Sequence, residues 1–281
     1  MANEGMRELW ATGAEGWVAH KDLFDAELAP FADVLLASLQ PGPDDHVLDV
    51  GCGTGVVLAG AVERDANGVG VDISPAMIDA AREHVDGASF EVVDAQTADL
   101  TPLGPFTKVV SRFGVMFFDD PTAAFANIRR AAAPGADLAF VCWRSAEENQ
   151  MFTLGVNVLL GRMDPPPSPP TPGAPGPLAF ADPDRVRTIL EGAGWADVNV
   201  VPFDAMCDYS RNGSDGVEER LTVILNISGG RVARAQLEPK LGPEAWAALL
   251  DDVRDVLRQN LVDGTVKFNG ATWLVTAKNP S

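Results

Sequence analysis

The stretch Val47-Leu48-Asp49-Val50-Gly51-Cys52-Gly53-Thr54-Gly55 decides the fold that this chain adopts. A short apolar run carries an acid near its end, and three glycines then alternate with small residues. Apolar side chains follow from Val56 to Ala61 at spacings that suit the buried side of a helix. The pattern predicts a strand, a tight glycine turn and the start of a helix, where the backbone can approach a ligand closely.

A second acid closes another short apolar run, Val69-Gly70-Val71-Asp72. In α/β nucleoside sites an acid about 20 residues beyond the glycine turn accepts hydrogen bonds from ribose hydroxyls. We therefore expect Asp72 to bind a ribose.

Two kinds of ligand compete for such a turn. A dinucleotide fingerprint, G-x-G-x-x-G, would place its third glycine where this chain has Val56. Asp49 also stands close to the first glycine, and its charge would repel a pyrophosphate. A ligand with cationic groups suits this carboxylate better, and S-adenosylmethionine carries a sulfonium and an ammonium.

With these residues, the segment Val47 to Gly55 resembles the first motif of the class I (Rossmann-like) S-adenosylmethionine-dependent methyltransferases. The resemblance implies that the methionine moiety lies against the amides of the turn, and that the adenine lies near Ile73 and the acid Asp94. It also implies that the segment after the predicted strand 106–111 resembles the fourth motif of the family and borders the transferred methyl group. The implied cofactor-binding residues are Asp49, Gly51, Cys52, Gly53, Thr54, Gly55, Asp72, Ile73, Met77, Asp94, Ala95, Gln96, Ser111, Arg112 and Phe113.

The fourth motif departs from the family at one point. Many small-molecule members place a histidine in this loop, whereas this chain has Met116 with Phe117 beside it. A general base is needed only if the acceptor arrives protonated, and His20 is the histidine that we expect to serve. Arg112, the second predicted catalytic residue, would pair a carboxylate or phenolate of the substrate; a surface ion pair is the alternative.

Two tryptophans, Trp10 and Trp17, precede the first predicted strand. In methyltransferases of this type an N-terminal segment often covers cofactor and substrate, so these rings are expected to bind substrate together with Met116 and Phe117. The alternative is that the aromatic side chains are core residues, since large aromatics are buried readily wherever they fall.

The composition and net charge restrict the kinds of partner that we expect this chain to bind. Lys and Arg number 21 against 40 Asp and Glu, which gives a formal charge of −19. Such a surface repels phosphate backbones and anionic membranes, so we expect neither nucleic acid nor membrane as partner. Three separate cysteines make neither a disulfide framework nor a metal site, and no signal peptide is visible, so a cytoplasmic protein without metal is predicted. The sequence leaves the oligomeric state open, with a homodimer as one alternative.

The order of elements predicts an α/β fold with a doubly wound, seven-stranded, mostly parallel sheet whose final strand is antiparallel. N-terminal helices over 1–40 would form a lid on a methyltransferase domain over 41–281. That domain would contain a loop insertion over 145–181, with an extended proline-rich stretch at 164–177, and a helical cap over 205–262. Strands are expected at 46–50, 68–71, 89–93, 106–111, 137–143, 196–202 and 266–277, and the cap helices at 217–228 and 243–261.

We therefore expect methyl transfer from S-adenosylmethionine to a small apolar or aromatic acceptor, at O, N or C, similar to ubiquinone, menaquinone and natural-product methyltransferases. Two other functions remain open. The chain could be a non-catalytic or repurposed S-adenosylmethionine-binding protein, which the absence of an obvious base permits. A nicotinamide-dependent dehydrogenase is disfavoured by the glycine spacing and by Asp49.

Overall fold

A seven-stranded sheet forms the centre of the computed structural model, which describes residues 3–168 and 171–280. The strand order is β3-β2-β1-β4-β5-β7-β6. Strands β1 to β5 pair in parallel, while β7 runs antiparallel to both of its neighbours, which confirms the predicted sheet. The strands are β1 (His46–Val50), β2 (Asn67–Asp72), β3 (Ser89–Val92), β4 (Phe106–Arg112), β5 (Ala132–Trp143), β6 (Ala196–Asp208) and β7 (Lys267–Lys278).

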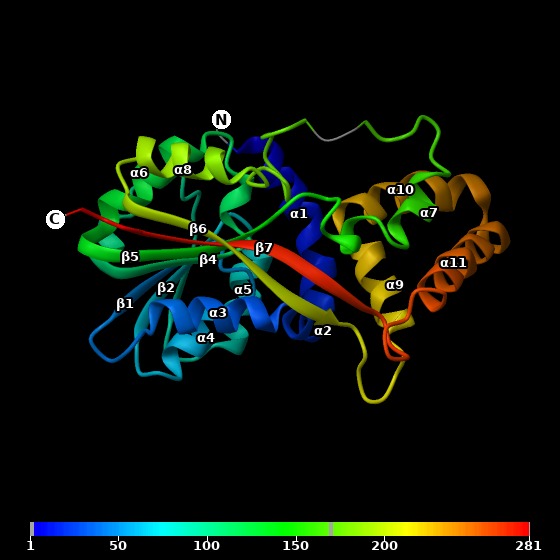
Figure 1. Cartoon of the computed structure of the whole chain (residues 1–281), viewed down its shortest axis with the longest axis horizontal. Helices are drawn as coiled ribbons and strands as arrows, with labels where there is room; N and C mark the ends of the chain where they lie inside the picture. Colours follow the sequence, from blue (N-terminus) through cyan, green and yellow to red (C-terminus); the bar gives the residue numbers. More distant parts are fainter. Residues whose placement is uncertain (1–2, 169–170, 281) are drawn as a thin grey trace.

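Helices cover both faces of the sheet (Figure 1). One face carries α3 (Ala29–Leu39), α4 (Val56–Val62) and α5 (Pro75–His84), and the other carries α6 (Pro121–Ala131) and α8 (Pro183–Gly192). The chain leaves β1 towards β2 and β3 and then returns to β4 on the other side of β1. The strand order therefore reverses between β1 and β4, and the crevice at their carboxyl ends is where this kind of sheet binds ligands.

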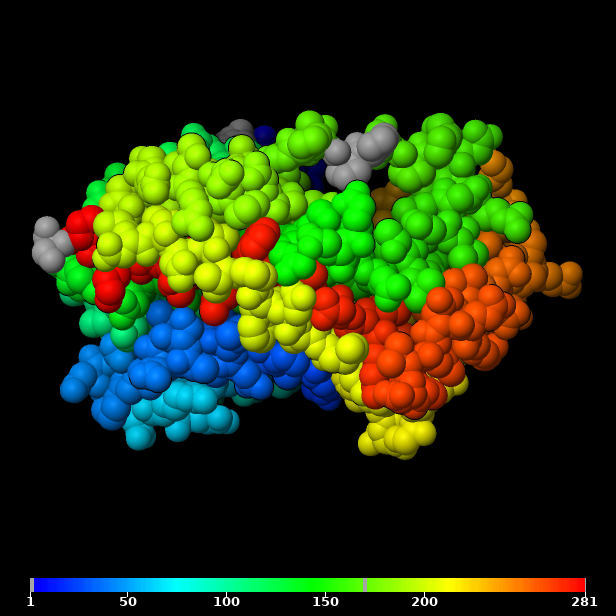
Figure 2. All heavy atoms as spheres, in the orientation of Figure 1, coloured from blue at the N-terminus to red at the C-terminus, as the bar shows by residue number. Residues whose placement is uncertain are grey.

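A helical lobe extends the molecule beyond the far ends of β6 and β7 (Figures 1 and 2). It contains α7 (Val156–Leu160), α9 (Val217–Asn226), α10 (Ser228–Leu241) and α11 (Pro243–Arg258). The two long strands reach the lobe because they stay paired to their ends, where Asp208 lies opposite Lys267.

The lobe departs from the sequence-based expectation at three places. Strand β6 continues six residues past Pro202, because it is an edge strand, where a missing N–H donor is tolerated. Helix α10, which was not expected, starts with Gly229 and Gly230 and contains Pro239, residues that argue against a helix by propensity. Tertiary packing overrides that propensity: a Cβ on Gly230 would lie 1.7 Å from the Ile224 carbonyl oxygen. The predicted loop insertion also holds helix α7.

The proline-rich stretch has neither helix nor strand at residues 164–168 and 171–177, as its composition predicts. The rest of that prediction, residues 169–170, falls outside the described residues. None of the helices in the described ranges is long and apolar enough to cross a membrane.

Two N-terminal helices, α1 (Glu4–Ala19) and α2 (Lys21–Glu27), precede α3. Helix α1 lies between the sheet and the helical lobe (Figure 1). It packs closely on the lobe: a Cβ on Gly13 would lie 2.2 Å from Arg231 Nη1, and one on Gly16 would lie 2.2 Å from Asn226 Oδ1. Gly13 and Gly16 therefore let this helix approach the lobe closely.

Candidate functional site

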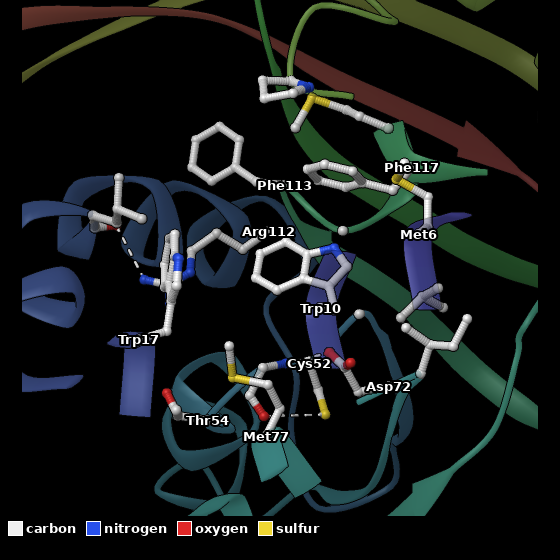
Figure 3. Close-up of a pocket in the computed structure, with 18 of the residues that line it drawn as sticks. Met6, Trp10, Trp17, Cys52, Thr54, Asp72, Met77, Arg112, Phe113 and Phe117 are labelled. Atoms are coloured by element: carbon white, nitrogen blue, oxygen red, sulfur yellow. Dashed lines mark hydrogen bonds between the residues drawn. The ribbon is translucent and has the colours of Figure 1, made fainter. Parts of the chain in front are cut away.

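A cavity of about 300 Å³ opens at the carboxyl ends of β1, β2 and β4, between the sheet and α1. Its lining brings together most of the residues that the sequence singled out, although they come from separate segments (Figure 3). The predicted site residues that line it are Trp10, Trp17, Asp49, Gly51, Cys52, Gly53, Thr54, Asp72, Ile73, Met77, Asp94, Ala95, Arg112, Phe113, Met116 and Phe117.

The glycine turn uses its own amides to hold its shape. Its first two N–H groups donate to the Val71 carbonyl at 2.8 and 3.1 Å, and that of its last glycine donates within the turn at 3.0 Å. The Gly53 N–H donates to Asp72 Oδ2 at 3.0 Å. These amides are engaged inside the protein, contrary to the expectation that they would hold the methionine moiety. The turn instead offers close backbone approach, with φ of +68° at Gly51 and +55° at Gly53.

Asp72 is tied to the backbone through both carboxylate oxygens. Besides the bond from Gly53, the N–H of Ser74 donates to Asp72 Oδ1 at 2.9 Å. Burial raises the pKa of Asp72, and the two N–H donors partly offset that rise. Each oxygen accepts one of these two hydrogen bonds and keeps a lone pair that a ligand hydroxyl can use.

Asp49 is buried with both carboxylate oxygens lacking a hydrogen-bond partner in the described part of the chain. Burial raises its pKa to about 7; the Arg112 guanidinium lowers this pKa and the Asp72 carboxylate raises it further. A buried charge without a partner is unfavourable. The Asp49 carboxylate, at the cavity wall, is therefore expected either to bind a cation or to hold a proton.

Arg112 joins β4 to the N-terminal helices. Its Nη2 lies 3.5 Å from Asp25 Oδ1, and its Nη1 donates to the Leu28 carbonyl at 3.4 Å. Lys21 pairs with the other Asp25 oxygen at 2.7 Å, and the Thr54 hydroxyl donates to Asp25 Oδ1 at 3.5 Å. Arg112 thus faces the cavity as part of an ion-pair network, which corrects the alternative of a surface ion pair: its side chain is 13% exposed.

Aromatic rings form the wall opposite Asp49 and Asp72. Phe113 stacks on Trp143, with ring centroids 4.2 Å apart, and Trp10 meets Phe117 edge-on at 5.5 Å. Figure 3 shows Trp10 between these phenylalanines and the side that carries Cys52 and Asp72. Phe113 has φ of +64°, a conformation that a bulky residue rarely adopts and that is typical of functional sites.

Asn3 connects the start of α1 to the predicted adenine end of the cavity. Its Nδ2 donates to Asp94 Oδ1 at 2.8 Å, and the Asp119 N–H donates to Asn3 Oδ1 at 2.7 Å. The N–H of Gln96 donates to the same Asp94 oxygen at 2.9 Å. Asn3 lines the cavity, although the sequence analysis did not select it.

Four predicted site residues do not line the cavity: His20, Gly55, Gln96 and Ser111. His20 is exposed at the junction of α1 and α2, where its backbone rather than its ring makes hydrogen bonds, so its assignment as a base has no geometric support. Ser111 has a positioning part instead. Its hydroxyl donates to the Val50 carbonyl at 2.7 Å and accepts the Gly114 N–H at 3.1 Å, which holds the fourth-motif loop against the turn.

The sequence analysis missed the cavity-lining acids of α2, Asp25 and Glu27. One signal was available: Glu27 follows Phe24 by three residues and precedes Phe31 by four, so it falls on the apolar side of the helical repeat. An acid on such a face is buried and must be paired or functional. Among the described residues, no group of His, Cys, Asp and Glu side chains could hold a metal ion.

The chain is similar to known proteins over part of its length. Residues 47–135, about a third of the chain, match the family described as "Methyltransferase domain". An "Uncharacterized protein" of Mycobacterium tuberculosis is 29% identical over 141 residues, which are 49% of each chain. "Aklanonic acid methyltransferase DauC" of a Streptomyces species is 32% identical over 119 residues, which are 40% of this chain and 54% of that protein. The chain thus spans about half the length of the curated relatives it matches.

A solved structure from Bacillus halodurans shares the fold. It superposes with a TM-score of 0.55 at 17% identity and covers 89% of this chain and 99% of its own. At that identity the likeness shows the fold alone, and it extends through the sheet to the C-terminal half that the family match does not reach.

Proposed function

We propose that this chain, which carries a class I, S-adenosylmethionine-dependent methyltransferase domain, transfers a methyl group to a small apolar or aromatic acceptor. The observation that carries the proposal is the two-sided cavity. One side presents the unpartnered carboxylate of Asp49 and the ribose-type acid Asp72, and the other presents stacked aromatic rings.

The residues present fit S-adenosylmethionine. Asp49 would pair with the ammonium group, because both of its buried oxygens lack partners. Asp72 would accept the ribose hydroxyls, and the apolar side chains of Ile73 and Met77 would contact the adenine, with Asp94 at its edge. When bound, this cofactor supplies an electrophilic methyl group on a cationic sulfur.

The acceptor side supports an apolar or aromatic substrate. Most of its lining is aromatic or aliphatic and comes from the N-terminal helices, the fourth-motif loop and the helical lobe. The chain carries a formal charge of −19, which disfavours nucleic acid as the acceptor. The relative from Streptomyces acts, by its name, on aklanonic acid, a small molecule. The three buried, free cysteines are compatible with a reducing compartment, so the proposal includes the cytoplasm.

Calorimetric titration with S-adenosylmethionine, S-adenosylhomocysteine and NADH tests the cofactor first. Binding of both sulfur ligands with no heat from NADH is expected, followed by a mass gain of one methyl on acceptors from an aromatic and quinone-like panel. The exposed substitution Asp86→Asn serves as a control with wild-type affinity. Binding of NADH in place of the sulfur ligands would favour the dehydrogenase, and cofactor binding without any transfer would favour the repurposed binding protein.

A further inference from the structure

Three buried polar side chains from distant segments form a chain of contacts beside the cavity. The Tyr209 hydroxyl donates to Glu27 Oε1, and Arg220 Nη1 donates to the Tyr209 oxygen at 3.3 Å. The guanidinium carbon of Arg220 lies 5.1 Å from the ring centroids of both Tyr209 and Phe268. Glu27 is 1% exposed, and Tyr209 and Arg220 are fully buried. None of these three residues belongs to the glycine turn or to the later cofactor segments.

Glu27 is the member of this group that lines the cavity. Its Oε1 is held by Tyr209, whereas its Oε2 has no hydrogen-bond partner among residues 3–168 and 171–280. Within those residues no cation lies in ion-pair range of Glu27, although Arg220 is its neighbour in the cluster. A carboxylate that served stability alone would be expected to use both oxygens, because an unmet buried acceptor is costly.

The groups that face Glu27 come from four elements. Arg220 of α9, the Tyr209 hydroxyl at the end of β6, Arg211 in the following loop and Arg112 of β4 all lower its pKa, while burial raises it more strongly. The resulting pKa of Glu27 is about 7. A base with this pKa changes protonation state near neutral pH, which suits general acid–base catalysis.

We propose that Glu27 is the general base of the reaction, and that the acceptor is a phenol or enol that enters the cavity with its hydroxyl proton in place. This inference rests on the proposed methyl transfer. Glu27 Oε2 takes the hydroxyl proton, the acceptor oxygen forms a bond to the methyl carbon, and the carbon–sulfur electron pair leaves with the sulfur. The products are a methyl ether, a neutral thioether and one proton, which Glu27 passes to solvent.

The charges around the cavity favour this acceptor class over a carboxylate. Asp25, Glu27 and Asp49 all line the same cavity, and a substrate carboxylate would be repelled by them. An ordinary phenol has a pKa of about 10 and therefore arrives neutral. Arg112 lies on the same wall and would stabilise the phenolate as it forms.

The test compares wild type with Glu27→Gln, Tyr209→Phe and a control, Glu219→Gln. Glu219 lies at the start of α9, outside the cavity lining, and accepts a hydrogen bond from Ser214 at 2.7 Å. The acceptors are an unsubstituted phenol and its 2,4-dinitro derivative, a nitro derivative that is almost fully ionised in neutral solution. Turnover is measured at saturating S-adenosylmethionine, where Asp49 is paired and kcat reports groups in the bound complex.

Glu27→Gln is expected to lower kcat on the phenol about 10²–10⁴-fold while leaving cofactor affinity unchanged. The wild-type kcat should fall as pH drops below about 7, which gives the pH profile an acidic limb. Glu27→Gln should lose this limb. It should also keep its activity on the ionised nitro derivative. Tyr209→Phe removes a hydrogen bond that lowers the pKa of Glu27, so its limb should move to higher pH. Glu219→Gln should match wild type.

A non-kinetic readout separates catalysis from folding. In an Asp49→Asn background, infrared difference spectra between about pH 6 and about pH 8 should contain a protonated-carboxyl band that Glu27→Gln removes. Wild-type kcat and pH profile in Glu27→Gln would overturn the proposal, as would transfer by wild type to amines or carboxylates but to no phenol or enol. Failure of wild type to bind the cofactor would instead overturn the proposed function itself.

Discussion

The cofactor side and the acceptor side of the cavity are built in different ways. On the cofactor side, Asp49 and Asp72 stand at the ends of neighbouring parallel strands, and each is placed by its own strand; Asp72 also accepts the N–H of Ser74, two residues further on. On the acceptor side, the cavity lining includes Trp10 of α1, Glu27 of α2 and Trp143 of β5. Trp143 lies more than a hundred residues after the other two, so these side chains meet through tertiary packing. The first side is thus specified by local motifs and the second by long-range contacts.

This difference predicts that substitutions on the two sides of the cavity affect different kinetic and binding constants. Changes on the cofactor side should alter cofactor affinity and leave the choice of acceptor untouched. Changes on the acceptor side should alter turnover or acceptor affinity at constant cofactor affinity.

Asp49→Asn should weaken S-adenosylmethionine binding by about 3–5 kcal/mol, because it removes the charged partner of a buried cation. The same substitution should stabilise the cofactor-free protein at alkaline pH. The folded pKa of Asp49, about 7, lies above its ordinary value of 3.8, so its stability contribution is present in acid and lost as pH rises through about 7. Titration calorimetry and thermal unfolding across this pH range check both effects. A gain in melting temperature that is equal at every pH would contradict the assignment.

The pH dependence of cofactor affinity follows from the same carboxyl group. Binding of the cation requires ionised Asp49, so the affinity should fall about tenfold for each pH unit below about 7 and should be constant above it. Calorimetry in buffers of different ionisation enthalpy should detect release of about half a proton on binding at pH 7, rising towards one proton as the pH falls below the pKa of Asp49. A flat affinity profile, with no proton released, would place the cation elsewhere.

Asp72→Ala should weaken cofactor binding by about 1.5–3 kcal/mol through the loss of hydrogen bonds to a charged group. It should also loosen the glycine turn, since the N–H groups of Gly53 and Ser74 lose their acceptor. Asp72→Asn keeps an oxygen acceptor and should lose less. Fluorescence or calorimetric titration measures the affinities, and wild-type affinity in Asp72→Ala would remove this residue from the site.

Trp10→Ala should raise the KM for the acceptor roughly fivefold, a loss of about 1 kcal/mol, because the ring packs edge-on against Phe117 in the aromatic wall. Trp10→Phe keeps an aromatic ring and should recover most of that loss. Cofactor affinity should stay at the wild-type value in both proteins. A matching loss of cofactor affinity would show that the two sides do not separate as described.

His20→Ala should leave kcat, KM and stability within experimental error of wild type. The side chain is exposed and lies outside the cavity lining. Steady-state assays beside Glu27→Gln give the sharpest contrast, since the two residues belong to the same pair of helices. A large loss of turnover in His20→Ala with full activity in Glu27→Gln would reverse the two assignments.

The sequence predicted which strand-end acids line the cavity because their positions depend on local structure. An acid at the end of a buried parallel strand, beside a glycine turn, lies at the crevice where such a sheet binds ligands. The positions of Asp49 and Asp72 could therefore be predicted from their neighbours in the chain. The engaged turn amides were not predictable in the same way. Two of them donate to the Val71 carbonyl, which belongs to the next strand, so these bonds depend on sheet register.

The acceptor side could be predicted only in composition. The tryptophans and the fourth-motif phenylalanine were selected as aromatic, but nothing near Glu27 in the sequence reveals that Tyr209 would bind it from 182 residues away. Helix α10 was missed because its glycines and proline oppose a helix locally, whereas close packing against α9 requires a glycine at position 230. Long-range packing decides these features, and a single sequence carries little information about it.

The hydrogen bond from Asn3 to Asp94 has a consequence for the order of binding. Asp94 anchors Asn3, the residue that precedes helix α1, and this helix presents Met6, Trp10 and Trp17 to the cavity. A ligand that competes with Asn3 for the Asp94 carboxylate therefore acts on the same helix, α1, that lines the acceptor side of the cavity. Occupancy of one side is therefore thermodynamically linked to the shape of the other: a ligand that displaces Asn3 from Asp94 weakens the hold on α1, and by reciprocity an acceptor that requires α1 in place lowers the affinity for such a ligand.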